Sequence, residues 1–517
     1  MTQSFCFVTM TAALCGSVTV ENDNIEDGNK VVPESIDDYS SQWCEWALKK
    51  ANTISENVTV VSVDIKRLSS DSNGLSNGAG LSDAPDGGGL SDAQIMRIEL
   101  GYGGEITGTE PDSMIAKWFT NVSLKISLHW RILFRLMGEE YGAGLEENFY
   151  RSEIQFCNEI LPSIKDTFAH PKLYYIGILD RGNRNYWNGV IRDKPCNVKS
   201  VVLMQDMKGW ESKDVITNFL NGGLDISNAE ASFKNVAVLH AAYWEKSVDN
   251  TTHSFVKPSN CEKELRGAAH AYHAAKARNK MLSSTKICLR QIDKFKTLWG
   301  GHEWMAVAKE VKMPSWFVAD DLSNGKHPVL NDPSVQEMLS VLAQRYPAFN
   351  KSVASDYLKK PMQTLLHGDF HVGNNMYGVG KDKGKVVTFD FQGVGRGRVA
   401  VEVVYYFSMM PDVSNYMHLA KVYHNALVLN GVSKYSYGEF KQDIIIQMGE
   451  LVVRLIMECV TISPSTMEKI WKMYGDKYND MVKVFDMGAM AWSLVMVTDL
   501  YLKNKQGFLK EESFDDV

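Results

Sequence analysis

Three features are missing from the 517-residue chain, and each absence argues against a class of protein. No long run of Lys and Arg occurs and the formal net charge is −7, whereas general nucleic-acid and anionic-membrane binders present a basic face. No stretch reaches the roughly 18 consecutive apolar residues that a membrane-spanning helix needs. The eight cysteines include no CxxC pair and no Cys/His spacing typical of zinc sites. We therefore expect a small-molecule enzyme with reduced thiols and a cytoplasmic location, without a nucleic-acid or membrane partner.

The N-terminal part of the chain differs from the rest in composition. The first twenty residues carry no charge and lack the basic region of a secretory signal, which argues against a cleaved leader. Residues 21–40 are acidic and polar. This composition predicts that residues 1–40 form a flexible or disordered tail.

The chain is too long for one hydrophobic core, and its two halves have different patterns. Before about residue 205, β-branched and alternating segments predict strands, whereas longer helical periodicity prevails after about residue 210. This segregation predicts an α+β fold with a strand-rich lobe at 41–205, a helical lobe at 206–517 and a cleft between them. The expected strands are 58–68, 93–102, 113–119, 172–179 and 199–207.

A glycine-rich segment interrupts the first half. Within residues 70–92 the unit GLS occurs three times, starting at Gly74, Gly80 and Gly89. Such a glycine density excludes a helix or a strand. We therefore expect an insertion or turn between two strands of the first lobe.

Two short motifs interrupt the helical half: LLHGDFHVGNNMY at 365–377 and VVTFDFQG at 386–393. Phosphoryl transfer from ATP needs one carboxylate to orient and deprotonate the acceptor hydroxyl, and oxygen ligands for Mg²⁺. Asp369 in the catalytic loop 367–375 fits the first role. Asn374 and Asp390, the latter in DFQ at 390–392, fit the second.

HGDFHVGNN together with FDFQ resembles the aminoglycoside-phosphotransferase and choline-kinase-like superfamily, and most nearly its ecdysteroid-kinase-like (CHK-type) branch. The resemblance implies a bilobal, protein-kinase-like fold with a small β-rich lobe and a larger helical lobe. It also implies a kinase that uses ATP and Mg²⁺ to phosphorylate a hydroxyl group of a small molecule. Which alcohol serves as acceptor stays open, because sterol, amine, sugar and antibiotic substrates all fit the template.

The likeness extends beyond the two motifs. MIAKWF supplies Lys117 at the expected strand, and YRSEIQFCNEILP supplies Glu153 as its partner. Lys117 lies between apolar pairs, so we expect it to face inward and to need that partner. By resemblance, the segment VVLMQDM is the hinge, and the glycine-rich segment 87–91 covers the phosphates. The implied nucleotide contacts are Gly88, Gly89, Ser91, Lys117, Gln205 and Met207.

The chain departs from its relatives at two positions: His371 stands where the branch commonly has Trp, and Glu402 where relatives often have Asp. A protein kinase would have a long activation segment ending in A-P-E after the metal-binding Asp. Here DFQGVGRGR leads directly into VAVEVVYYF, a helical pattern, and no APE follows. A small-molecule acceptor is therefore favoured over a protein.

Two other functions stay open on sequence grounds. HGDFH is also H-x-D-x-H, a pattern that could hold metal in a hydrolase, although the other histidines form no second cluster. The chain could also be a catalytically silent nucleotide-binding pseudokinase, although it retains the ionic residues of the template. For His367 we expect a packing role, with hydrogen bonds to the loop backbone.

Overall fold

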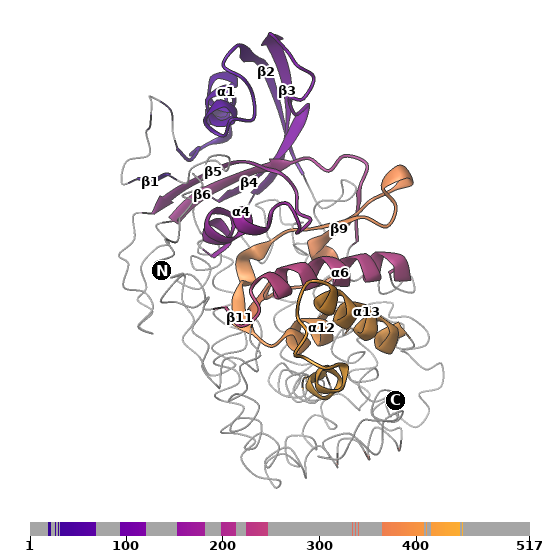
Figure 1. The fold of residues 1–517 in the computed structure, drawn as a ribbon. Helices are drawn as coiled ribbons and strands as arrows, with labels where there is room; N and C mark the ends of the chain where they lie inside the picture. Colours follow the sequence, from indigo (N-terminus) through magenta and orange to yellow (C-terminus); the bar gives the residue numbers. More distant parts are fainter. Residues whose placement is uncertain are drawn as a thin grey trace, which may run out of the picture.

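The computed structural model describes residues 19–21, 26, 29, 31–68, 94–119, 152–180, 198–213, 224–246, 333, 337, 340, 364–407, 410, 415–444 and 447. A twisted sheet forms one part of this structure, and helices from the second half of the chain form the other (Figure 1). The expected α+β arrangement is therefore confirmed. Within the described residues, no helix combines the length and the apolar character needed to cross a membrane.

Six strands make the sheet, in the order β1-β5-β6-β4-β3-β2. Every pair of neighbouring strands from β5 to β2 in this order is antiparallel. Strand β1 lies at the edge of the sheet and pairs in parallel with β5. The five longer strands confirm the predicted ones within a few residues. The strands are β1 (Thr19–Glu21), β2 (Val58–Arg67), β3 (Gln94–Gly104), β4 (Ser113–Phe119), β5 (Leu173–Asp180) and β6 (Val198–Gln205).

The two faces of this sheet carry separate apolar cores, because side chains alternate along a strand. In β6, Val201 and Leu203 belong to the core beneath helix α1 (Ser41–Lys50), whereas Val202 belongs to the core on the opposite face. In β4, Trp118 lies in the α1 core and Phe119 in the opposite one. The alternation places Lys117 on the same face as Phe119, toward the second half of the chain.

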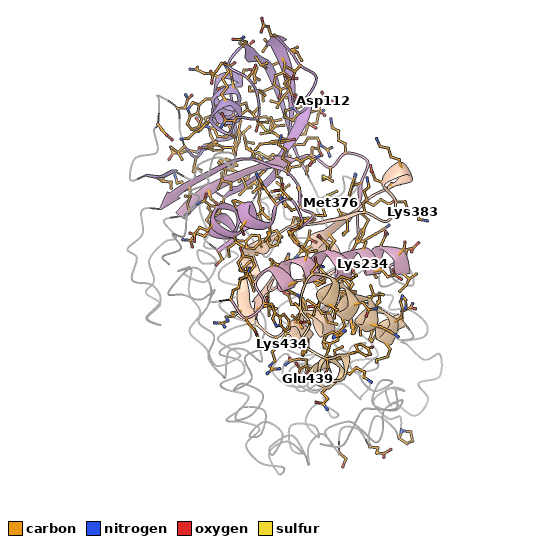
Figure 2. All side chains as sticks on the ribbon, in the orientation of Figure 1. Asp112, Lys234, Met376, Lys383, Lys434 and Glu439 are labelled. Carbon is orange, nitrogen blue, oxygen red and sulfur yellow. The ribbon has the colours of Figure 1, made fainter. Side chains whose placement is uncertain are left out.

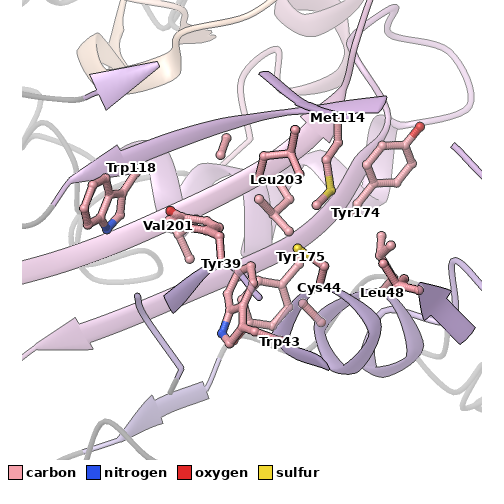
Figure 3. Close-up of a cluster of buried hydrophobic side chains, with 14 of the residues drawn as sticks. Tyr39, Trp43, Cys44, Leu48, Met114, Trp118, Tyr174, Tyr175, Val201 and Leu203 are labelled. Carbon is pink, nitrogen blue, oxygen red and sulfur yellow. The ribbon is translucent and has the colours of Figure 1, made fainter. Parts of the chain in front are cut away.

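The α1 core is rich in aromatic rings (Figure 3). Ser40 caps the helix, because its hydroxyl oxygen accepts a hydrogen bond from the backbone N–H of Trp43 at 3.1 Å. Trp43 meets Tyr39 and Tyr175 edge-on, with ring centroids 5.0 and 5.8 Å apart. Burial raises the pKa of the neighbouring Cys44 thiol to about 12, so this cysteine is an apolar core residue.

Part of the expected tail belongs to the same core. Val31 and Val32 are fully buried, and Tyr39 is also buried. The indole N–H of Trp118 donates to the carbonyl oxygen of Pro33 at 2.7 Å, and Tyr175 Oη donates to that of Val31 at 3.0 Å. The prediction of a solvated tail is therefore wrong for residues 31–40. The acidic residues dominate the composition there, but the apolar ones between them dock on the sheet.

The second half of the chain combines helices with short strands. Helix α6 packs against α13 and against strands β8 and β10 (Figure 1). A three-stranded sheet has the order β10-β9-β7, and β11 pairs with β8. The helices are α6 (Ile226–Ala242), α12 (Val399–Phe407) and α13 (Tyr416–Leu429). The strands are β7 (Glu211–Ser212), β8 (Thr364–Leu366), β9 (Asn375–Tyr377), β10 (Val386–Thr388) and β11 (Gly395–Gly397).

One helical segment connects the sheet with the second half. It contains a π-helical turn, η3 (Phe156–Ile160), followed by α4 (Leu161–Ile164), so this segment is not a regular α-helix. The ring of Phe156 stacks on that of Phe391, with centroids 4.1 Å apart. This contact brings the segment that carries Glu153 against the DFQ motif.

Candidate active site

The loop between β8 and β9 carries the HGDFHVGNN motif, and glycine is required at its start. Gly368 has φ +87°, and a Cβ there would lie 1.7 Å from the carbonyl oxygen of Gly393. The loop backbone therefore runs directly against the residues that follow DFQ. His367 Nε2 also joins the two motifs through a 2.9 Å hydrogen bond to the carbonyl oxygen of Phe389. This bond agrees with the packing role expected for His367.

Asp369 lies at the open side of this loop. Its side chain is 24% exposed, whereas the histidines on both sides of it in the motif are buried. Its Oδ1 accepts a hydrogen bond from Tyr405 Oη at 3.2 Å. Such a carboxylate is anchored by the protein and still accessible, as a general base for an external hydroxyl must be.

Asn374 has a buried side-chain oxygen in a fixed position. Its amide nitrogen donates to the backbone oxygen of Asp369 at 2.8 Å, so its orientation is fixed. Its Oδ1 is buried, and no hydrogen-bond donor reaches it. A buried oxygen without a donor is costly unless a cation or water meets it. The residues present therefore fit Mg²⁺, which takes hard oxygen ligands.

Asp390 lies beside Asn374, because the N–H of Phe389 donates to the carbonyl oxygen of Asn374 at 3.1 Å. The Asp390 backbone is left-handed, with φ 68° and ψ 62°. A non-glycine residue in this region is strained, and such strain clusters at functional sites. Gln392 Nε2 donates to Asp390 Oδ2 at 3.1 Å and fixes the carboxylate further.

Lys117 joins the sheet to both acidic residues. Its Nζ lies 2.6 Å from Glu153 Oε2 and 2.6 Å from Asp390 Oδ1. Burial works against the charged ammonium, but the charges of Asp390 and Glu153 outweigh it and raise the pKa of Lys117. Burial raises the pKa of Glu153, and the ammonium of Lys117 opposes that shift. Three segments far apart in sequence thus meet at one cation.

The expected hinge connects the two halves at the end of β6. Gln205 is exposed, and its Oε1 accepts from the backbone N–H of Lys172 at 3.3 Å. Met207 is buried in an apolar cluster with Met376 and Val387, and Met376 lies between the large sheet and helix α6 (Figure 2). The structure thus places Met207 in an apolar core directly after the end of β6. The other expected nucleotide contacts, Gly88, Gly89 and Ser91, lie outside the described residues.

Sequence analysis assigned no role to Glu402, which the structure places under the catalytic loop. Glu402 is buried; it accepts a hydrogen bond from the backbone N–H of Gly368 and lies 2.8 Å from His240 Nε2. His240 Nδ1 is in turn 2.6 Å from Tyr423 Oη. The sequence signal for such a role is the position of Glu402 within the apolar run VAVEVVYYF, because a charge that is buried there needs hydrogen-bond partners. Which partners it has depends on tertiary contacts.

The H-x-D-x-H alternative is not supported by this geometry. His367 Nε2 is hydrogen-bonded to the carbonyl oxygen of Phe389, and His371 Nδ1 accepts a hydrogen bond from the backbone N–H of Gly373 at 3.0 Å. In the part of the chain that the structure describes, no three His, Cys, Asp or Glu side chains form a group that could hold a metal ion. A zinc-type hydrolase site is therefore absent from these residues.

Comparison with known proteins gave one family and several structures. Among solved structures, the chain is similar to a microcompartment-associated aminopropanol kinase (10% identity, 90% of this chain and 99% of that chain, TM-score 0.40). It is also similar to a Plasmodium vivax ethanolamine kinase, with 10% identity, 90% of each chain covered and a TM-score of 0.31. A spectinomycin phosphotransferase is similar with 11% identity, 84% of this chain and 94% of that chain covered, and a TM-score of 0.30. No curated protein matches the chain. The model of the ecdysteroid kinase-like family matches residues 138–433, more than half of the sequence. The chain belongs to the ecdysteroid kinase-like family.

Proposed function

We propose that the protein transfers the γ-phosphoryl group of ATP to a hydroxyl group of a small molecule, with Mg²⁺ as cofactor. The observation that carries this proposal is the position of Lys117 Nζ, 2.6 Å from both Glu153 and Asp390. Kinases use such a lysine and acidic pair to hold the nucleotide phosphates and their metal. Membership in the ecdysteroid kinase-like family supports the same function.

In this proposal each half of the structure has its own part. The lobe at 41–205 supplies Lys117 for the phosphates, Glu153 to position that lysine, and backbone N–H groups of Gly88, Gly89 and Ser91. The hinge at Gln205 and Met207 receives the adenine. The lobe at 206–517 supplies the acceptor side and the metal ligands. Asn374 and Asp390 would hold Mg²⁺, which neutralises charge on the phosphates when it is bound.

Asp369 has the chemical role in the transfer itself. Its carboxylate orients the acceptor hydroxyl and takes its proton as the alcohol oxygen bonds to the γ-phosphorus. The bond between that phosphorus and the β,γ-bridging oxygen breaks, and ADP leaves. Positioning and charge neutralisation supply most of the rate gain in such a reaction.

The direct test starts with the unknown acceptor. Purified protein is incubated with labelled ATP, Mg²⁺ and a metabolite extract, and mass spectrometry identifies molecules that gain one phosphate. Asp369→Asn should lower transfer to the identified acceptor by at least a hundredfold, because the base is lost, while MgATP binding persists. Asp382→Asn is the matched control, since Asp382 pairs with Lys385 on the exposed β9–β10 turn. Parental transfer by Asp369→Asn would disprove the assignment of the base.

A further inference from the structure

Tyr405 contacts the carboxylate that serves as base in the proposed reaction. Its hydroxyl donates to Asp369 Oδ1 at 3.2 Å. Tyr405 lies on α12, three residues after Glu402, and positions i and i+3 share one face of a helix. Glu402 accepts from the backbone N–H of Gly368. One face of α12 therefore contacts two consecutive residues of the loop. Glu402 binds the backbone of Gly368, and Tyr405 binds the side chain of Asp369.

The two oxygens of Asp369 have different surroundings. Oδ1 has the Tyr405 hydroxyl, whereas Oδ2 lies 3.4 Å from Asn374 Nδ2 and 3.7 Å from His371 Nε2. The Tyr405 hydroxyl is the nearest of these three groups to the carboxylate. The contact at Oδ1 restricts rotation of the carboxylate.

The burial of α12 separates Tyr405 from the structural residues beside it. Val404 and Tyr406 are buried in the core, and Tyr406 Oη lies 3.3 Å from the buried hydroxyl of Tyr377. Tyr405 is only partly buried. Its ring also meets that of His371 edge-on, with centroids 6.3 Å apart. The phenol thus lies at the accessible side of the loop, next to the partly exposed Asp369 carboxylate.

We propose that Tyr405 is a positioning residue for phosphoryl transfer: its hydroxyl restricts rotation of the Asp369 carboxylate and so holds that carboxylate in the orientation that receives the acceptor hydroxyl. This role rests on the proposed kinase function. During transfer, the acceptor proton moves to the Asp369 carboxylate, and the Tyr405 hydrogen bond to Oδ1 persists. A general base that is misplaced by a fraction of an ångström loses much of its rate advantage.

The test is the variant Tyr405→Phe, which removes one oxygen and keeps the ring. Turnover is measured with the acceptor found by the extract screen and, separately, as MgATP hydrolysis with water as acceptor. We expect kcat to fall about tenfold, with unchanged KM for ATP and unchanged MgATP dissociation constant, since the hydroxyl acts only on the base. The melting temperature should stay that of the parent. The matched control is Tyr437→Phe, because the hydroxyl of Tyr437 donates to the Met417 carbonyl oxygen at 3.3 Å and not to a residue of the site. This control variant should keep the parental kcat.

The outcomes separate this inference from the proposed function. A Tyr405→Phe enzyme with kcat within twofold of the parent overturns the role of Tyr405 and leaves the kinase function standing. Weaker MgATP binding together with a lower melting temperature also overturns it, because those changes indicate a structural role. A parent protein that binds MgATP and transfers phosphate to neither acceptor overturns the kinase function, and the role of Tyr405 with it.

Discussion

His367 is fixed in one neutral form by two hydrogen bonds. A carbonyl oxygen can only accept, so Nε2 carries the hydrogen toward Phe389, and Nδ1 is left to accept from the backbone N–H of Asp369 at 3.3 Å. Protonation of Nδ1 would break the second bond. Burial lowers the pKa of His367, although the nearby carboxylates of Glu402, Asp369 and Asp390 oppose that shift.

This lowered pKa predicts that stability depends on pH. Between the unfolded value of about 6.5 and the lower folded value, the unfolded chain binds more protons, so the free energy of unfolding decreases as the pH falls through that window. Denaturant unfolding between about pH 7 and pH 5 measures this slope. His367→Gln should reduce it, and so should His424→Gln, because burial also lowers the pKa of His424. A parental slope in His367→Gln would contradict the prediction.

At the scale of the element, the sequence predicted the strands well and their assembly poorly. SMIAKWF forms β4 within the expected bounds because a short apolar run is a local signal, and the apolar pairs on both sides of Lys117 predicted that it faces inward. Local pattern says nothing about the order of strands in the sheet or about the contact from Tyr405 to Asp369. Both arise from pairings between residues distant in sequence. The docking of segment 31–40 was missed because its acidic residues concealed a few buried apolar ones.

That segment gives a test at the same scale. Val32→Ala should lower the free energy of unfolding by about 2 kcal/mol, because a fully buried side chain loses two methyl groups and leaves a cavity. Val61→Ala removes the same groups from a side chain that is 62% exposed on β2, and should change stability by less than about 0.5 kcal/mol. Urea unfolding of both variants gives the comparison. Equal effects would mean that residues 31–40 do not dock on the sheet.

At the scale of the whole molecule, the candidate site joins the sheet to the helical half. Lys117 lies on β4, whereas Asp390 follows β10, a strand that packs against α6, and Asn374 directly precedes β9. A ligand that contacts both halves binds the folded state and not the unfolded chain. MgATP at a hundred times its dissociation constant should therefore stabilise the protein by about 2.7 kcal/mol.

Removal of the metal separates the two contributions to this stabilisation. ATP with EDTA should raise the melting temperature less than MgATP does, because Lys117 still meets the phosphates while Asn374 and Asp390 have no cation to share with them. In Asp390→Asn the two conditions should give the same shift, since the carboxylate that binds the metal is gone. The shift is compared within each variant, because loss of the ion pair with Lys117 also changes the stability of the free protein. Asp382→Asn should keep the parental difference between MgATP and ATP with EDTA. If Asp390→Asn keeps that difference as well, Asp390 is not a ligand of the metal, and the cation must be held elsewhere in the cleft.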